Sequence, residues 1–155
     1  SGIDYSYMSE GITSLGLLES NSVDFLWSHS VLQHIHIDSF LNVLNEFHRI
    51  LKPGSLMSHK VDLKDCIAFG LNNMRFSDVT WNSDRFFTSG FYTNRIRRDE
   101  LINLFSDSGF DVIKTNNFYF EEIPLNLTQC SEDIRARYNE HDLIYSGTHC
   151  VLRRK

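Results

Sequence analysis

Two apolar runs and one helical repeat organise residues 21–65. The run at residues 23–27 ends at small polar residues, which is typical of a strand buried on both faces of a parallel sheet. Apolar residues at helical spacing follow, from Asp38 as a good N-cap to Leu51. The Lys-Pro-Gly sequence at residues 52–54 stops this helix, and a second strand is expected at residues 56–61. The pattern therefore predicts a βαβ crossover, which is right-handed in nearly all known sheets.

The carboxyl ends of the two expected strands are residues 28–30 (Ser-His-Ser) and residues 62–65 (Asp-Leu-Lys-Asp). Ligands of open α/β sheets bind outside the carboxyl ends of the strands. We therefore expect the functional site at these two segments.

The rest of the chain predicts a single α/β domain without internal repeats or linkers. The remaining elements are expected in this order: a short strand at residues 1–7, a short helix or loop at 10–19 and a helix at 98–108 that Gly109 ends. Residues 110–114 and 118–122 then form either one strand or a bent strand pair with a turn or bulge at Asn116-Asn117. A short helix at 131–138, capped by Ser131, and a closing strand at 143–152 follow.

The connection at residues 66–91 is long and holds aromatic residues that follow no clear period. A connection of this kind beside a strand end favours a lid or a substrate-binding insertion. An equally good interpretation is that the aromatic side chains cap the core.

Composition and charge narrow the classes of function. With 155 residues, 41% of them hydrophobic, the chain can form one domain with a real core. A net charge of -5 argues against non-specific nucleic-acid binding. Arg95, Arg97 and Arg98 form either a phosphate or carboxylate contact or the solvated start of a helix. No apolar run is long enough to span a membrane, and three widely spaced cysteines favour a reducing, cytoplasmic setting.

Three short segments are recognisable sequence motifs: SVDFLWS at residues 22–28, VLQHI at residues 31–35 and FHRILKPG at residues 47–54. Their content and order resemble the second half of class I S-adenosylmethionine-dependent methyltransferases. The resemblance extends over roughly the whole chain and implies S-adenosylmethionine as cofactor. It also implies a partial Rossmann-like sheet, with a parallel βαβ core and a C-terminal antiparallel strand, in one truncated domain at residues 1–155. Ser55 stands where the family often has a second glycine.

The family's glycine-rich first motif is absent, because no GxGxG occurs in the sequence. The resemblance therefore implies the C-terminal part of a methyltransferase whose N-terminal strands are missing. Because that motif supplies backbone N–H groups to the cofactor, the chain is expected to bind cofactor weakly and to be inactive on its own. The strand at residues 23–27 would then lie at an open apolar sheet edge, which favours a homodimer.

The resemblance and the strand ends together give candidate site residues. Methyl transfer requires orientation of donor and acceptor and, for a hydroxyl acceptor, a base that removes a proton. The candidate cofactor contacts are Glu10, Gly11, Ser28, His29 and Ser30. The candidate catalytic residues are His34, His59 and Asp62, with His29 and Asp65 as further candidates for the base. The candidate acceptor contacts are Asp65, Tyr92, Asn94 and Arg95.

Three of these residues have a structural interpretation as well. His34 could be a helix-start histidine bonded to backbone, His59 a core residue and Asp65 a cap of the next segment.

Residues 71–77 and 89–95 are similar to methyltransferases found with bacterial surface-polysaccharide synthesis. This similarity implies a sugar or another small molecule as the acceptor.

Other functions fit the sequence less well. His29, His34, His36 and Asp38 could suggest a metal site, but they lack a clear third-ligand spacing, so no metal is expected. A serine hydrolase would need a nucleophile elbow, and no GxSxG occurs. The main alternative is a non-enzymatic scaffold or oligomerisation module built from a methyltransferase fold.

Overall fold

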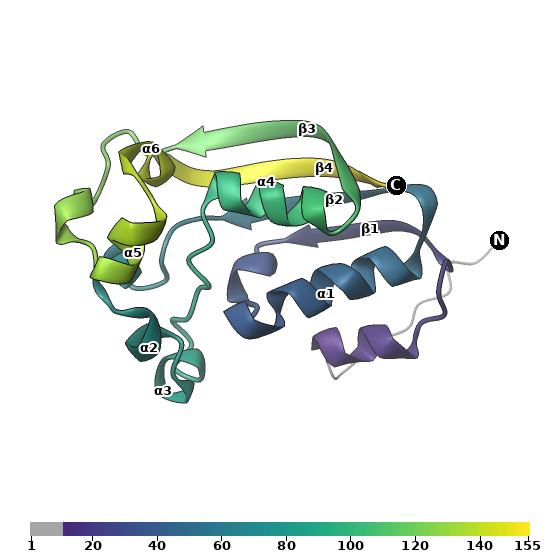
Figure 1. Cartoon of the computed structure of the whole chain (residues 1–155), viewed down its shortest axis with the longest axis horizontal. Coiled ribbons are helices and arrows are strands. Elements are labelled where there is room, and N and C mark those ends of the chain that lie inside the picture. Colours follow the sequence, from purple (N-terminus) through teal and green to yellow (C-terminus); the bar gives the residue numbers. More distant parts are fainter. Residues whose placement is uncertain (1–10) are drawn as a thin grey trace.

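A four-stranded mixed sheet organises residues 11–155, the part of the chain that the computed structural model describes (Figure 1). The strands are β1 (Val23–His29), β2 (Leu51–Asp62), β3 (Phe110–Tyr119) and β4 (Tyr145–Arg154), in the spatial order β1-β2-β4-β3. β1 and β2 are parallel, and β4 lies antiparallel between β2 and β3. This arrangement confirms the predicted α/β class, with its parallel βαβ core and antiparallel final strand. The strand expected at residues 1–7 lies outside the described residues, as does Glu10.

Helix α1 (Ile37–Ile50) forms the βαβ crossover because its apolar residues recur at helical spacing. Phe40, Leu44 and Phe47 are buried against the sheet. The prediction that Asp38 caps the helix is wrong. The cap is His36, whose Nδ1 accepts the Asp38 N–H at 3.3 Å, so the helix begins two residues earlier than a capping Asp38 would allow.

Residues 52–54 end the helix as predicted, but they lie inside β2 instead of before it. The pairing with β1 runs from Val23 with Leu51 to Phe25 with Leu56, so β2 holds extra residues at this point. Gly54 has a φ of 78°, a backbone conformation that favours glycine. The extra residues therefore form a local irregularity at the start of β2.

Helices α1 and α4 (Arg98–Asp107) cover the same face of the sheet (Figure 1). The ring of His59 on β2 stacks on Phe47 of α1 and on Phe105 of α4, with centroid distances of 5.5 and 5.9 Å. On β1, Phe25 and Trp27 are 56% and 65% exposed. The prediction that this strand is buried on both faces is therefore wrong. β1 is an edge strand of the described sheet, and its apolar side chains do not all find partners.

Strand β3 is continuous through Asn116 and Asn117, as the single-strand alternative predicts, and neither a turn nor a bulge lies at these two residues. The register with β4 shifts instead between Val112 and Lys114 and again next to Phe118. Asn117 stays in the ladder, and its Oδ1 accepts the hydroxyl of Thr148 at 2.9 Å. The predicted helix before this strand is confirmed as α4, and Gly109 follows it with a φ of 89°.

The connections beyond the carboxyl ends of β1, β2 and β3 fold into short helices at one end of the sheet (Figure 1). Within residues 11–155 the short helical elements are η1 (Gly11–Leu17), which precedes β1, and η2 (Leu32–His34), η3 (Asn72–Arg75), α2 (Asp78–Trp81), α3 (Asp84–Phe87), η4 (Leu127–Gln129), α5 (Glu132–Arg137) and α6 (Glu140–Leu143). A second small core, which includes Met74, Ile134 and Tyr138, joins η3 to α5. Ser131 holds the predicted N-cap position of α5, although its hydroxyl makes no capping bond.

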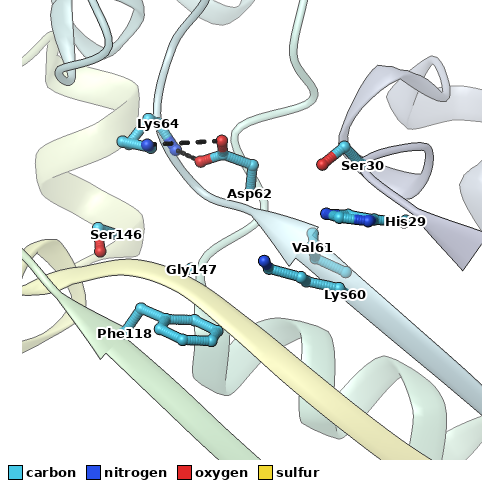
Figure 2. A pocket seen from close by; sticks show the side chains of 9 residues that line it. All are labelled: His29, Ser30, Lys60, Val61, Asp62, Lys64, Phe118, Ser146 and Gly147. Carbon is cyan, nitrogen blue, oxygen red and sulfur yellow. Dashed lines mark hydrogen bonds and ion pairs between the residues drawn. The ribbon is translucent and has the colours of Figure 1, made fainter.

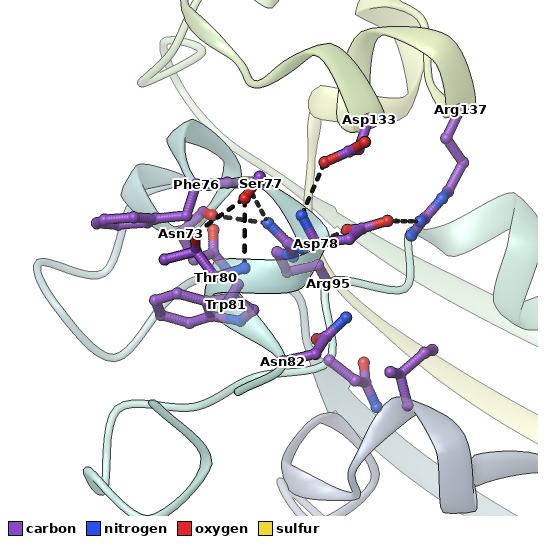
Figure 3. A network of polar contacts seen from close by, with 12 residues as sticks. Asn73, Phe76, Ser77, Asp78, Thr80, Trp81, Asn82, Arg95, Asp133 and Arg137 are labelled. Atoms are coloured by element: carbon purple, nitrogen blue, oxygen red, sulfur yellow. Dashed lines mark hydrogen bonds and ion pairs between the residues drawn. The ribbon is translucent and has the colours of Figure 1, made fainter. Parts of the chain in front are cut away.

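A polar network fixes the connection at residues 66–91 to α5 (Figure 3). The Arg95 guanidinium donates to the backbone oxygens of Asn73 and Phe76 at 3.1 and 2.7 Å and pairs with Asp78. Asp78 also pairs with Arg137 of α5. Trp81 is fully buried in this connection, whereas Phe69 and Phe91 remain largely exposed. Part of the aromatic set therefore packs inside the fold and part faces solvent.

Arg95 and Arg97 do not form the solvated start of a helix, since both side chains are buried, and the carboxylate that Arg95 contacts is that of Asp78 in the same chain. Arg97 donates to the backbone oxygens of Leu63 and Asp142 at 2.6 and 2.9 Å and also to that of Tyr145. Burial lowers the pKa of Arg97 to about 10, so the guanidinium stays charged at neutral pH. Arg97 thereby links the end of β2 to α6 and to the start of β4.

Candidate functional site

The carboxyl ends of β1 and β2 lie side by side, because His29 pairs with Lys60 in the parallel ladder. The backbone N–H of Ser30 extends the pairing by donating to the Lys60 oxygen at 2.9 Å. Ser30 has a φ of 55°, which is uncommon for a residue other than glycine and turns the chain sharply out of the sheet. This end of the sheet is where open α/β sheets bind ligands.

A polar cavity of about 280 Å³ opens at this end of the sheet (Figure 2). Residues from all four strand ends line it: His29, Ser30, Lys60, Val61, Asp62, Lys64, Phe118, Ser146 and Gly147. Asp62 accepts the backbone N–H of Lys64 at 3.0 Å, and its carboxylate lies 3.7 Å from the Lys64 ammonium. The Lys60 ammonium lies 5.4 Å from the centre of the Phe118 ring. The cavity therefore combines two cations, one carboxylate and an aromatic wall.

A second cavity, of about 410 Å³, adjoins the same end of β1 and is mostly apolar. Its lining comes from η1, β1, η2 and α1: Leu15, Leu26, Trp27, Ser28, His29, Val31, Leu32, Ile35 and Phe47. His29 lines both cavities. Ser28 and Ser30, the residues on either side of it, line the apolar and the polar cavity respectively. The predicted cofactor contacts at residues 28–30 therefore form the partition between the two cavities.

Ser28 is joined to the core by His59, whose Nδ1 lies 2.7 Å from the Ser28 hydroxyl oxygen. His59 is fully buried, and burial lowers its pKa to about 4, with a smaller contribution from the charge of His149. The imidazole is therefore neutral at pH 7. His59 lines neither cavity. Its predicted catalytic role stays a prediction, while its observed contacts fix the rotamer of Ser28.

The other predicted catalytic residues lie in different places. Asp62 lines the polar cavity. His34 is exposed beyond the partition, and its Nδ1 bonds to the backbone oxygen of Tyr92 at 2.9 Å, as the structural interpretation anticipated. Gly11, a predicted cofactor contact, begins η1, the element that contributes Leu15 to the apolar cavity.

The four predicted acceptor contacts are buried, and their polar atoms bond within the protein. Asp65 accepts the backbone N–H groups of Ile67 and Ala68 at 3.0 and 2.9 Å. Asn94 donates to the backbone oxygens of Leu32 and Ile35, and Arg95 belongs to the network of Figure 3. Tyr92, whose pKa is raised by burial, accepts the backbone N–H of Ile37 and donates to Asn82. These contacts stabilise the loops around the site, and a direct role in acceptor binding stays a prediction.

Sequence reasoning missed the cavity residues Lys60, Phe118 and Gly147. The alternation of β2 carried a signal for Lys60, because a period of two places it on the face opposite His59 and Val61. Phe118 and Gly147 reach the cavity through the register of β3 with β4, where they pair with each other. No local pattern in the sequence gives that register.

Neither a metal site nor a membrane span appears in the part of the chain that the structure describes. Residues 11–155 hold no group of three or more histidine, cysteine or acidic side chains placed to bind a metal ion. His36 instead bonds through Nε2 to the Asn82 oxygen at 3.1 Å and stacks on Tyr92. Among the described helices, none has both the length and the apolarity that a membrane crossing requires.

Comparisons with known proteins agree with this fold. The family model described as a methyltransferase domain matches residues 2–58. A S-adenosylmethionine-dependent methyltransferase from Archaeoglobus fulgidus superposes with a TM-score of 0.56 at 15% identity, covering 96% of this chain and 66% of its own. A second, from Methanosarcina mazei, gives 0.55 at 16% identity, covering 88% and 61%. A comparison with curated protein sequences gives no match.

The phosphoethanolamine N-methyltransferase 2 of Haemonchus contortus, solved in complex with S-adenosyl-L-methionine, gives a TM-score of 0.51 at 16% identity and covers 88% of this chain and 34% of its own. At these identities the similarity establishes the fold, which is that of S-adenosylmethionine-dependent methyltransferases. The chain spans about a third to two thirds of the length of these three structures.

Proposed function

We propose that this chain forms the acceptor side and part of the donor side of an S-adenosylmethionine-dependent methyltransferase. The observation that carries the proposal is the pair of cavities that meet at residues 28–30, on the carboxyl ends of two parallel strands. The methyltransferase fold and the match at residues 2–58 support the same reaction class. Two adjoining cavities suit a reaction that brings a donor and an acceptor together.

The residues of the apolar cavity fit the adenosyl part of the cofactor. Leu15, Leu32 and Phe47 supply apolar surface, and the Ser28 hydroxyl, held by His59, supplies a polar group at the wall. When bound, S-adenosylmethionine supplies an activated methyl group. These residues would contact the cofactor from one side only, because the sequence has no glycine-rich loop to contact its other side. We therefore expect weak cofactor binding and little or no turnover by these 155 residues.

The polar cavity is the proposed acceptor site. His29 and Asp62 border it and are the groups placed to take a proton from an acceptor hydroxyl. The acceptor is a small molecule, with a sugar favoured by the resemblance of residues 71–77 and 89–95. We place the reaction in the cytoplasm, since Cys66, Cys130 and Cys150 are all free thiols.

Calorimetric titration with S-adenosylhomocysteine tests the donor site. We expect measurable heat and a dissociation constant of roughly 1 mM, about -4 kcal/mol. Val31→Glu places a carboxylate at the wall of the apolar cavity and should weaken binding, because the bound ligand would cover an unpaired charge. Val79→Glu is the matched control, since Val79 is exposed on α2 and lines neither cavity. Absence of heat from the unmodified chain would contradict the proposal and favour the scaffold alternative.

We also propose that two copies associate through β1. This strand is an edge of the described sheet, and Phe25, Trp27 and Leu56 expose apolar side chains on or beside it. We expect a dimer in light scattering and a shift towards monomer in Trp27→Lys. Val79→Lys, on α2, should leave the dimer intact. A monomer at the concentration used for calorimetry would contradict this proposal.

A further inference from the structure

Lys60 carries a charge that the described residues leave without an ionic partner. The ammonium groups of Lys52 and Lys64 lie 2.6 and 3.7 Å from carboxylates, whereas Lys60 forms no ion pair within residues 11–155. The Lys60 ammonium instead borders the polar cavity beside the Phe118 ring. A cation in this position is available to an anionic ligand.

Hydrogen-bond donors surround this ammonium group and are also available (Figure 2). The hydroxyls of Ser30 and Ser146 and the ring of His29 line the same cavity, and none of these side chains forms a hydrogen bond within the described residues. Asp62 is the one carboxylate in the lining, and Lys64 offsets its charge through the contact at 3.7 Å. The cavity therefore presents a surplus of positive charge and of donors to a ligand.

Gly147 makes the aromatic wall accessible. It lies between Asp62 of β2 and Phe118 of β3 in the sheet register. A Cβ at this position would lie 3.1 Å from the Val61 oxygen and 3.4 Å from Cδ2 of Phe118. Because glycine has no Cβ, the Phe118 ring lies across β4 beside Lys60, and it remains 45% exposed. The ring offers a flat apolar surface next to the cation.

We propose that the polar cavity binds a small acceptor that carries an anionic group, phosphate or carboxylate, next to a ring. Lys60 binds the anion together with the hydroxyls of Ser30 and Ser146, and the ligand ring packs on Phe118. The volume of about 280 Å³ is at the small end of ligand pockets and suits a single ring with its substituents. That the ligand is the methyl acceptor rests on the proposed function. Binding of the ligand to this cavity can be tested independently of it.

Titration of the full chain with phenyl phosphate, followed by amide chemical shifts, tests the inference. We expect the largest changes at residues 29–30, 60–64 and 146–147, and binding about tenfold weaker in Lys60→Met, which lacks the charged donor. Lys114→Met is the matched control, because Lys114 is an exposed lysine of β3 outside the cavity, and its affinity should equal that of the unmodified chain. Phe118→Leu should weaken phenyl phosphate about threefold and leave inorganic phosphate unchanged.

The same titration with benzoate distinguishes carboxylate from phosphate. Whichever probe binds more tightly, benzoate or phenyl phosphate, identifies the preferred anionic group. Shift changes outside the cavity, or equal effects of Lys60→Met and Lys114→Met, would overturn the inference. Binding of S-adenosylhomocysteine without binding of either anionic probe would overturn this inference and leave the proposed function in place. Binding of the probes without S-adenosylhomocysteine would support the anion site and contradict the donor site.

Discussion

Replacing Arg97 with methionine is expected to lower the free energy of unfolding by about 3 to 5 kcal/mol. The side chain is almost fully buried, and its guanidinium donates to the oxygens of Leu63, Asp142 and Tyr145. Methionine fills a similar space but leaves three carbonyl groups without donors, and each such group costs about 1 to 3 kcal/mol, partly offset by removal of a buried charge. Urea denaturation followed by circular dichroism measures the loss.

Arg98→Met is the control for this experiment. Arg98 is the next residue and pairs with Asp99 near the surface, so its loss should cost less than about 1 kcal/mol. The free energy of unfolding of Arg97→Lys should lie between those of the two methionine variants, since a single ammonium group cannot reproduce the several donors of the guanidinium. Equal stability of the Arg97 and Arg98 variants would show that Arg97 does not join the strand ends as described.

Acidification is expected to destabilise the chain through His59. The unfolded histidine binds its proton with a pKa near 6.5, whereas burial lowers the pKa of the folded residue to about 4. Between these values the unfolded chain binds more protons than the folded one, so stability falls as the pH falls. The loss attributable to His59 between about pH 7.5 and about pH 5 should be about 2 kcal/mol.

The variant that isolates this effect is the double substitution Ser28→Ala with His59→Phe. Phenylalanine keeps the stacking between Phe47 and Phe105, and alanine removes the hydroxyl that would lose its partner. Its free energy of unfolding should change with pH by about 2 kcal/mol less than that of the unmodified chain. If both proteins lose stability equally, His59 does not titrate as a buried neutral residue.

Local patterns predicted the elements well but not their surroundings. The strand, helix and strand of residues 23–62 follow from apolar periodicity, which acts within each element. Burial of β1 depends on what lies beside it, so the apolar run predicts a strand buried on both faces, whereas Phe25 and Trp27 are exposed. The N-cap is His36 and not the predicted Asp38. A histidine nitrogen can accept a backbone N–H at the helix start as a carboxylate does, and here His36 accepts that of Asp38.

Buried arginines were missed for a related reason. Arginine is usually exposed, and nothing near Arg97 in sequence shows that carbonyls 34 to 48 residues away will surround it. The candidate site was predicted in part: His29, Ser30 and Asp62 follow directly from the strand ends. Phe118 and Gly147 required the register of β3 with β4, and that register exists only in the folded sheet.

The central claim is that the carboxyl end of β1 forms one wall of a methyl-donor site. Mapping of amide chemical shifts with S-adenosylhomocysteine, raised to several times its expected dissociation constant, tests it most directly. We expect the largest changes at Ser28, His29, Val31, Leu32 and Leu15, which line the apolar cavity. Changes confined to α5 and α6, or no changes at all, would contradict it.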